Sequence, residues 1–445
     1  MRKKTVLLLA ILQLSVCYAG AAEKYPYIQI KPFPIFVWCA PEPTPQHMQW
    51  FKEGNFTVMA IAPKEQVYEQ LKKNWEGNFI VTQTWAEDRS ASMDTMLNFH
   101  KEDSKKIGCL VSDEPNSPEF PKLKQIFDHF RKEDPNRLCF VNLFPAEAGE
   151  FRLGESYQDH LEHYFEYLNP RFCSFDHYPC MRFNHDMPTY YNNIEQMRRL
   201  ALKNISQMIG FIQAVSTNEN RDVSESDLAW QVNTMLAYGC KGLWYFRYTT
   251  APYKSRKIEA GARDVSVYPI EVREYATTVY DVGEGILDGN DRPSYMYPFI
   301  KKINAETLVW GETLANLRST HVRHSGNSGY VAPVGAEMLR GDSIDTVQNV
   351  VASNPQKDMG FIVGYFENSN KQQYVMIVNK RHGEFLSRKE CSVDAVVTFR
   401  PDIKKAFSIS NIDGKELPVT ISNGQAILSI EGGSAVLLRL ESSGK

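Results

Sequence analysis

Two adjacent carboxylic acids, Asp113 and Glu114, directly follow the apolar stretch 107–111 and precede Pro115. A continuously apolar run is typical of a parallel strand that is buried on both faces. Because proline cannot donate a ladder hydrogen bond, the strand must end at or near Glu114. The pair is therefore expected at the C-terminal end of a strand, where a barrel of parallel strands carries its catalytic groups. The alternative is an acidic loop in which Asp113 only caps the next helix.

Similar short apolar runs alternate with helix-like segments from residue 35 to residue 314. This alternation is typical of βαβ units and a parallel sheet. About eight repeats fit a (β/α)₈ TIM barrel, an α/β fold of roughly 250 residues or somewhat more. A doubly wound sheet is the alternative, but its first turn is normally rich in glycine, and here that turn is rich in proline. The strands are predicted at 35–40, 56–62, 79–85, 107–114, 138–144, 172–179, 208–215 and 242–248.

From about Arg318, helical periodicity stops and short strand-like runs begin. Turn signals such as Asp413-Gly414 and Asn423-Gly424 separate them. This pattern predicts a small antiparallel β-sandwich. We therefore expect a barrel domain over residues 23–317 and a C-terminal β-sandwich domain over residues 318–445.

Residues 1–22 have the features of a signal peptide rather than of the fold. Positive charges at 2–4 precede an apolar stretch at 6–14 and a small-residue cleavage site at 19–22. The apolar stretch is far shorter than the roughly 20 residues that a membrane span needs. We expect an exported protein, in the periplasm or on the cell surface of a bacterium. Residues 14–17 also resemble a lipoprotein cleavage box, so a lipid anchor at Cys17 is an alternative.

Charge and motif content exclude several classes of function. The formal net charge of −3 and the absence of a dense basic run predict no nucleic-acid partner. No C-x-x-C, H-x-H or H-E-x-x-H motif occurs, so neither a metal nor another cofactor is expected. The cysteine spacing argues against a disulfide framework, although one bridge between Cys173 and Cys180 stays open.

The predicted strand ends would bring carboxylate, amide and indole side chains to one mouth of the barrel. Glycoside hydrolysis needs such a set, because one carboxylic acid protonates the leaving oxygen while a second carboxylate attacks the anomeric carbon or activates water. Indoles offer apolar faces to sugar rings, and polar side chains orient hydroxyl groups. Glu114 is the candidate acid. The candidate substrate-binding residues are Trp38, Trp85, Asp113, Asn142, His177, Tyr178, Gln213, Trp244 and Arg247.

Each of these residues also has an ordinary structural explanation. Trp38 and Trp244 lie on buried strands and could pack in the core. Asp176, in the sixth strand, could be a structural acceptor for the next loop. His177 more often packs against or orients a neighbour than transfers a proton, and no nucleophilic serine or cysteine motif accompanies it.

Three stretches, 112–115, 174–179 and 230–246, resemble secreted barrel glycosidases of gut-type bacteria. The whole arrangement resembles the retaining clan A glycoside hydrolases, and the C-terminal domain resembles that of family 42-like β-galactosidases. The resemblance implies a barrel fold, a carbohydrate substrate and hydrolysis of O-glycosyl bonds. It also implies that the acid/base residue is the glutamate at the end of strand four, which is Glu114.

The sequence departs from this clan at two positions. Asp113 stands where the clan usually has asparagine, and Gln213 stands where the nucleophilic glutamate ends strand seven. The second catalytic carboxylate is therefore expected to be Asp176. A separation of about 5 Å between the two carboxyl groups implies retention of the anomeric configuration, and roughly 6.5–9.5 Å implies inversion. The rival hypothesis, prompted by Gln213, is a carbohydrate-binding barrel that has lost catalysis.

Overall fold

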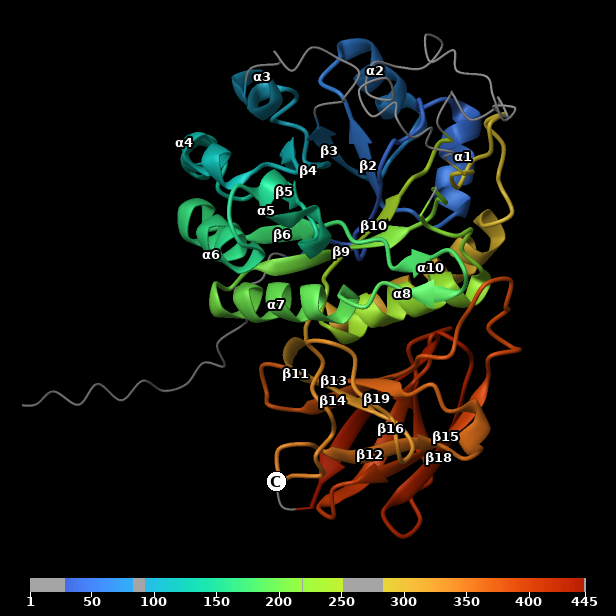
Figure 1. The fold of residues 1–445 in the computed structure, drawn as a ribbon. Helices are drawn as coiled ribbons and strands as arrows, with labels where there is room; N and C mark the ends of the chain where they lie inside the picture. The colour runs from blue at the N-terminus through green and yellow to red at the C-terminus, as the bar shows by residue number, and fades with distance from the viewer. Residues whose placement is uncertain (1–28, 83–92, 218, 251–282, 444–445) are drawn as a thin grey trace, which may run out of the picture.

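The computed structural model describes residues 29–82, 93–217, 219–250 and 283–443. Eight parallel strands close into a barrel in the order β1-β10-β9-β6-β5-β4-β3-β2, which confirms the predicted TIM barrel (Figure 1). The barrel strands are β1 (Ile35–Val37), β2 (Val58–Ile61), β3 (Asn78–Thr82), β4 (Lys106–Asp113), β5 (Leu138–Leu143), β6 (Phe172–Phe175), β9 (Gln207–Gln213) and β10 (Leu243–Phe246).

Helices surround the barrel, and the sequence signals at their ends explain where several of them begin. The helix α8 (Glu225–Ala237) starts with the predicted capping box, in which Ser224 and Asp227 bond to each other's backbone N–H groups. The short hairpin of β7 (Cys180–Met181) and β8 (His185–Asp186) interrupts the pattern after β6. The other helices are α1 (Pro45–Glu53), α2 (Glu65–Asn74), α3 (Met93–Asn98), α4 (Phe120–Glu133), α5 (Gly149–Leu153), α6 (Tyr157–Leu168), α7 (Tyr190–Lys203) and α10 (Tyr297–Leu314).

Large apolar side chains fill the inside of the barrel, as is usual when eight strands close on themselves. They form one cluster that includes Phe36, Leu110, Phe140, Phe211 and Trp244. Because these apolar side chains fill the interior, polar chemistry is confined to the rim above them.

The C-terminal domain is the predicted antiparallel β-sandwich, built from one six-stranded and one three-stranded sheet. The apolar runs at 360–365, 374–379, 395–399, 406–410, 424–430 and 434–440 predict six of its strands. The strands β11, β12 and β17 lie outside these runs, because polar residues obscure their alternation; β11 carries two histidines and two arginines. The larger sheet contains β11 (Arg318–Ser325), β13 (Phe361–Glu367), β14 (Gln373–Asn379), β19 (Ala435–Ser442), β16 (Ile403–Ile409) and β17 (Glu416–Val419). The smaller contains β12 (Val347–Ala352), β15 (Val393–Phe399) and β18 (Gln425–Ile430).

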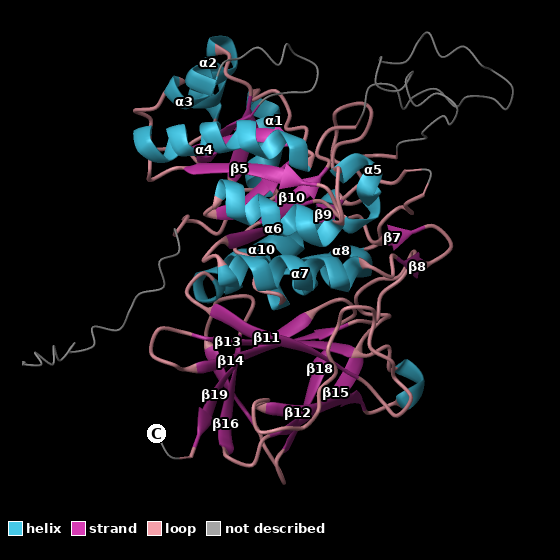
Figure 2. Ribbon diagram, turned by 60° about the vertical axis from the view of Figure 1, so that its left-hand side comes forward, coloured by secondary structure: helices cyan, strands magenta, loops and turns pink. Residues whose placement is uncertain are grey.

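The helices α7 and α8 lie between the barrel and the sandwich (Figures 1 and 2). The helix α8 is buried along its length because β9 covers it on one side and β13 and β14 cover it on the other. Gly364 permits this close approach, since an added Cβ atom would lie 2.2 Å from the carbonyl oxygen of Ala237. Near one end of the interface, the indole N–H of Trp310 donates to the carbonyl oxygen of Ile409 at 2.8 Å.

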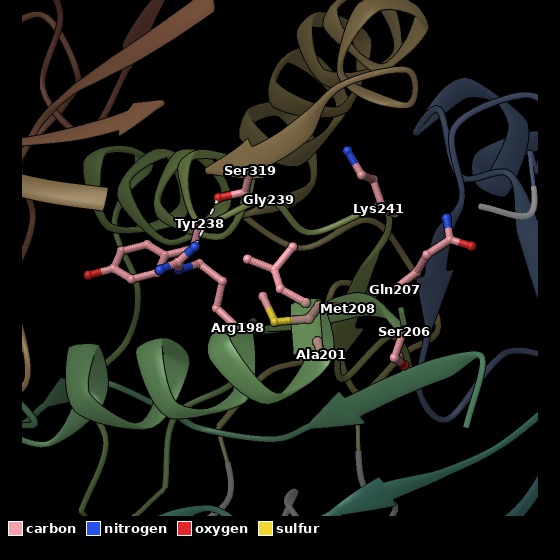
Figure 3. Close-up of a pocket in the computed structure, with 10 residues that line it drawn as sticks. Arg198, Ala201, Ser206, Gln207, Met208, Tyr238, Gly239, Lys241 and Ser319 are labelled. Atoms are coloured by element: carbon pink, nitrogen blue, oxygen red, sulfur yellow. Dashed lines mark hydrogen bonds between the residues drawn. The ribbon is translucent and has the colours of Figure 1, made fainter. Parts of the chain in front are cut away.

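A small cavity remains at this interface near the N-terminal end of β9 (Figure 3). Its volume of about 20 Å³ is enough for roughly one water molecule. Arg198 reaches across it to the hydroxyl oxygen of Ser319 at 3.4 Å, and the ammonium group of Lys241 binds the carbonyl oxygens of Leu314 and Leu317. The first contact joins α7 to β11 of the sandwich, and the second joins the segment between α8 and β10 to the end of α10. The cavity is too small for a sugar and is not a substrate site.

Some sequence-based expectations fall on residues outside this description. The predicted signal peptide and Cys17 lie outside the described residues, as does Trp85. Within the described ranges, no helix is long and apolar enough to cross a membrane. Among the same residues, no cluster of three metal-ligating side chains is present, and Cys173 and Cys180 are both free thiols rather than a bridge.

Candidate active site

Glu114 leaves the end of β4 in an unusual backbone conformation. Its φ of +46° lies in the left-handed region that few residues other than glycine adopt. Its backbone N–H donates to the carbonyl oxygen of Asn142 on β5 at 2.8 Å, which anchors this turn. Such a conformation costs on the order of 1 kcal/mol or more and clusters at functional positions. The chain therefore turns sharply at the residue predicted to be the acid.

The carboxyl groups of Glu114 and Asp176 are in hydrogen-bonding contact. Burial, together with the negative charges of Asp176 and Asp113, raises the pKa of Glu114 well above its usual range. Burial and Asp113 also raise the pKa of Asp176, but its hydrogen bonds oppose that rise. Two touching carboxyl groups cannot both be ionised, so the pair shares one proton, and that proton resides on Glu114.

Tyr178 binds one carboxylate oxygen of Asp176. Its hydroxyl group donates to Oδ2 of Asp176 at 3.1 Å, and the backbone N–H of Asp176 donates to Leu143 O at 3.2 Å. The other carboxylate oxygen, Oδ1, is buried and has no further donor among the described residues. A protonated Glu114 can donate a hydrogen bond to Asp176, which is consistent with the proton assignment.

Asp113 and Asn142 form a second polar unit beside this pair. The amide nitrogen of Asn142 donates to Oδ1 of Asp113 at 3.0 Å, and the hydroxyl group of Ser174 donates to the amide oxygen of Asn142 at 3.1 Å. The second bond fixes the amide so that its nitrogen faces Asp113. Asn142 is buried, so its observed role is to hold Asp113 beside Glu114 and Asp176.

His177 lies behind the pair rather than at the mouth. Its Nδ1 atom is 3.0 Å from the amide oxygen of Asn193 and 3.4 Å from a carboxylate oxygen of Glu147, and its ring meets the edge of Tyr190. Burial lowers the pKa of His177 to about 4, so the ring is neutral at pH 7. The side chain is 2% exposed, and the prediction that it binds substrate is not supported.

Gln213 has a structural role, which corrects the prediction that it binds sugar. Its amide oxygen accepts from the backbone N–H of Cys180 at 2.9 Å. Its amide nitrogen donates to the carbonyl oxygens of Cys180, Val215 and Arg221 at 3.2–3.3 Å. The side chain is completely buried and both of its N–H donors are in use, so it is not available to a ligand. The residue at the nucleophile position of the clan therefore joins two loops.

Trp244 is also a correction, because its indole belongs to the barrel core. The ring is fully buried and stacks between Phe36 at 4.9 Å and Phe211 at 5.5 Å. Neither face is open to a sugar. Trp38, which is partly exposed, covers Trp244 from above with ring centroids 5.4 Å apart. Of these two indoles, only Trp38 offers a surface to a ligand.

Arg247 and Arg152 add positive charge around the site. Arg247 follows β10 and is half-buried, with its Nε–H donating to the carbonyl oxygen of Thr249 at 2.6 Å. Arg152, on α5, favours the ionised form of Glu114 and so partly opposes the rise in its pKa. Sequence reasoning missed Arg152 and Glu147, because both lie in the segment between β5 and α6, which has no strand-end signal.

Comparisons with known proteins give only distant likenesses. No family model matches the chain, and no curated protein matches it. Similar solved structures include an α-amylase from Anoxybacillus (9% identity, 96% of each chain, TM-score 0.43). A maltogenic α-amylase from Thermotoga neapolitana is 9% identical over 92% of this chain and 99% of that chain, with a TM-score of 0.45. A β-galacturonidase from Eisenbergiella tayi is 12% identical over 59% and 48%, with a TM-score of 0.40. Likenesses this distant assign no activity.

Proposed function

We propose that the protein is a glycoside hydrolase that cleaves glycosidic bonds of oligo- or polysaccharides with Glu114 and Asp176. The contact between these two carboxyl groups at the rim of the barrel is the observation that carries the proposal. It supplies a protonated and an ionised carboxyl group side by side, which is the pair that glycoside hydrolysis needs. No metal or other cofactor takes part in this mechanism.

The proposed reaction has two steps. Glu114 first gives its proton to the leaving oxygen while a carboxylate oxygen of Asp176 attacks the anomeric carbon, so the glycosidic bond breaks and a glycosyl ester forms. The ionised Glu114 then removes a proton from water, and the water oxygen attacks the anomeric carbon. This releases the sugar, frees Asp176 and returns the proton to Glu114.

The hydrogen-bonding interaction between the two carboxyl groups supports retention of the anomeric configuration. An inverting enzyme needs its carboxyl groups roughly 6.5–9.5 Å apart, because a water molecule must attack from one of them. Carboxyl groups in hydrogen-bonding contact leave no room for that water. Asp176 is therefore assigned as the nucleophile, and Tyr178 stabilises its ionised form.

The remaining rim residues define the proposed sugar site. Trp38 provides an apolar face, and of the predicted polar residues Asp113, Tyr178 and Arg247 are not fully buried. Relation to family 42 remains part of this proposal, as do export to the periplasm or cell surface and a lipid anchor at Cys17. Residues 1–22 support export, because they have the pattern of a signal peptide.

The test is hydrolysis of a panel of plant and host glycans by the wild type, Glu114→Gln and Asp176→Asn. Both variants should lose activity by at least about 10³-fold, because each removes a group that makes or breaks a bond. NMR of the first-formed product should show the retained anomer. The rival function, carbohydrate binding without catalysis, would be favoured if the wild type binds a glycan without turnover and Glu114→Gln binds it equally well.

A further inference from the structure

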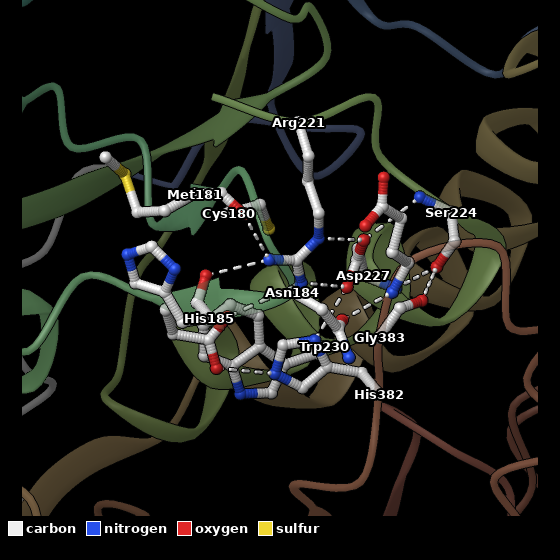
Figure 4. Close-up of polar contacts among 12 residues, drawn as sticks. Cys180, Met181, Asn184, His185, Arg221, Ser224, Asp227, Trp230, His382 and Gly383 are labelled. Carbon is white, nitrogen blue, oxygen red and sulfur yellow. Dashed lines mark hydrogen bonds and ion pairs between the residues drawn. The ribbon is translucent and has the colours of Figure 1, made fainter. Parts of the chain in front are cut away.

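A cluster of four charged side chains, three of them buried, joins the two domains (Figure 4). Arg221 binds Asp227 through two hydrogen bonds of 2.8 and 3.1 Å and lies 3.5 Å from Asp186. His382, which comes from the sandwich, lies 2.7 Å from Asp227 through Nδ1 and 3.1 Å from Asp186 through Nε2. Its ring stacks on Trp230 of α8 at 3.9 Å. Since both ring nitrogens face carboxylates, His382 is the imidazolium ion, and the cluster has two positive and two negative charges.

This cluster holds the β7–β8 hairpin. The Nη1 atom of Arg221 donates to the carbonyl oxygen of Met181 on β7 at 2.9 Å and to that of His185 on β8 at 2.8 Å. Asp186, at the end of β8, is the carboxylate that His382 binds. The sandwich makes one more bond to this hairpin, from the backbone N–H of Glu384 to the amide oxygen of Asn184 at 2.8 Å. Both strands and the turn of the hairpin are therefore held by residues that lie outside the hairpin.

The hairpin continues directly from the loop that carries Asp176. Only residues 177–179 separate Asp176 from Cys180, the first residue of β7. Gln213 binds the backbone of Cys180 on both its N–H and its carbonyl oxygen, and the amide of Asn220 donates to the carbonyl oxygen of Tyr178 at 3.0 Å. A displacement of the hairpin would therefore move Tyr178 and Asp176. Figure 2 shows the hairpin close to the loops that rise from the sandwich.

We propose that His382 of the C-terminal β-sandwich is a positioning residue for Asp176 and acts through Asp186 and the β7–β8 hairpin. The inference rests on the proposed function, because positioning matters only if Asp176 reacts. In this arrangement the sandwich completes the catalytic site rather than serving as a separate module. A displacement of about 1 Å in a catalytic group can cost on the order of 10²-fold in rate.

Other charged groups near His382 do not replace it. Lys380 is close enough for an attractive interaction with Asp186, but its ammonium group donates to the hydroxyl oxygen of Tyr330 at 2.8 Å. Arg221 lies 3.5 Å from Asp186, at the limit of a hydrogen bond. His382 is therefore the main partner of Asp186 and the one that links it to the sandwich.

The test compares His382→Gln with Trp310→Phe in the full-length protein. Both variants remove contacts across the interface between the domains, but Trp310 bonds to Ile409 and makes no contact with the hairpin. We expect kcat of His382→Gln to fall by on the order of 10²-fold with little change in KM, while Trp310→Phe keeps the wild-type kcat. Asp186→Asn, which changes a side chain that is 39% exposed, should also lower kcat and is the substitute if His382→Gln does not fold.

Hydrogen–deuterium exchange separates failure of this inference from failure of the proposed function. Amides of residues 176–186 should exchange faster in His382→Gln and Asp186→Asn than in the wild type, and at the wild-type rate in Trp310→Phe. Faster exchange in a protein that hydrolyses no glycan would support the positioning contact and reject the proposed function. Unchanged exchange, or an equal loss of kcat in His382→Gln and Trp310→Phe, would overturn the inference.

Discussion

The hydroxyl group of Tyr178 donates a 3.1 Å hydrogen bond to Oδ2 of Asp176, two residues before it in the same loop. The ring that carries this hydroxyl stacks on Phe246 at 5.1 Å, so the donor is held by β10 as well as by its own loop. A bond to an ionised carboxylate favours its charged form and lowers its pKa. Tyr178 thereby favours the ionised form of Asp176, although burial and the negative charge of Asp113 raise the pKa of this carboxyl group.

The first prediction concerns Tyr178→Phe, which removes this bond and keeps the ring. The pKa of Asp176 should rise, so the acid limb of the pH–rate profile should move to higher pH. A hydrogen bond to a charged group contributes about 1.5–3 kcal/mol, so a loss of kcat of roughly tenfold or more is expected. Tyr248→Phe is the control, because the Tyr248 hydroxyl is buried without a partner in the described part of the chain. An unshifted acid limb in Tyr178→Phe would contradict the assignment.

The second prediction is the pH profile of the wild type. Activity needs an ionised Asp176 and a protonated Glu114, and the pKa of each is raised above its ordinary value. The rate should therefore fall in acid as Asp176 gains a proton, and in alkali as Glu114 loses its proton. Both limbs belong to the pair and should lie above the ordinary carboxyl range near pH 4. Full activity at pH 4 that is lost by pH 6 would contradict it.

The third prediction is that Glu114→Gln makes the protein more stable while it removes activity. At a pH above the unfolded pKa of about 4.5, the native state holds a proton that the unfolded state has released, so wild-type stability falls as pH rises. The glutamine amide can donate to Asp176 as the protonated acid does, without that cost. We expect a gain of at least about 1 kcal/mol in the free energy of unfolding at pH 8, which disappears near pH 4.

Urea unfolding of the wild type and Glu114→Gln at both pH values measures this gain. Glu166→Gln, on the exposed side of α6, is the control for loss of one negative charge and should show no such pH-dependent gain. Equal stability of Glu114→Gln and the wild type at pH 8 would argue against a raised pKa for Glu114.

The fourth prediction concerns Gln213→Glu, which introduces a carboxylate at the end of β9. The new carboxylate would face the carbonyl oxygens of Cys180, Val215 and Arg221, which now accept from the amide. A buried carboxylate oxygen that faces carbonyl oxygens, with no donor between them, should lower the free energy of unfolding by about 1–3 kcal/mol or more. Thermal unfolding should show the loss, and activity should not increase. Gln425→Glu, on an exposed strand, should unfold like the wild type.

The fifth prediction distinguishes the two indoles. Trp38→Ala should raise KM for the best glycan by roughly tenfold or less with a small loss of stability, because the ring is partly exposed. Trp244→Ala should instead destabilise the fold by about 3–5 kcal/mol, the usual cost of emptying a buried aromatic site. Steady-state kinetics and urea unfolding check the pair. A raised KM in Trp244→Ala alone would reverse the assignment.

The fold was accessible from sequence, because alternating apolar runs predict parallel strands and strand ends converge at one rim. The same reasoning selected Glu114 and Asp176, the proposed catalytic pair. Glu114 and Asp176 follow two such runs and lie in contact. The polar partners were less accessible. Gln213 ends a strand just as they do, but its amide binds loop carbonyl groups whose positions depend on the folded chain.

Trp244 shows a different limit of the sequence analysis. It is the second residue of β10 rather than the last, and successive strand residues point to opposite faces. A shift of one or two positions along a strand therefore decides whether an indole packs in the barrel core or lies at the open end of the barrel. The apolar runs locate strands, but their ends are too uncertain to decide this for a single residue.

The chain passes from α10 to β11 through residues 315–317 alone. A sugar-binding domain on a long flexible linker can bind a polysaccharide far from the active site of its enzyme. Here the linker is only three residues long, so the sandwich cannot move independently of the barrel. This sandwich could therefore not be replaced by an unrelated domain without loss of activity. A replacement domain would have to reproduce the surface that packs on the barrel, including His382, which contacts the β7–β8 hairpin.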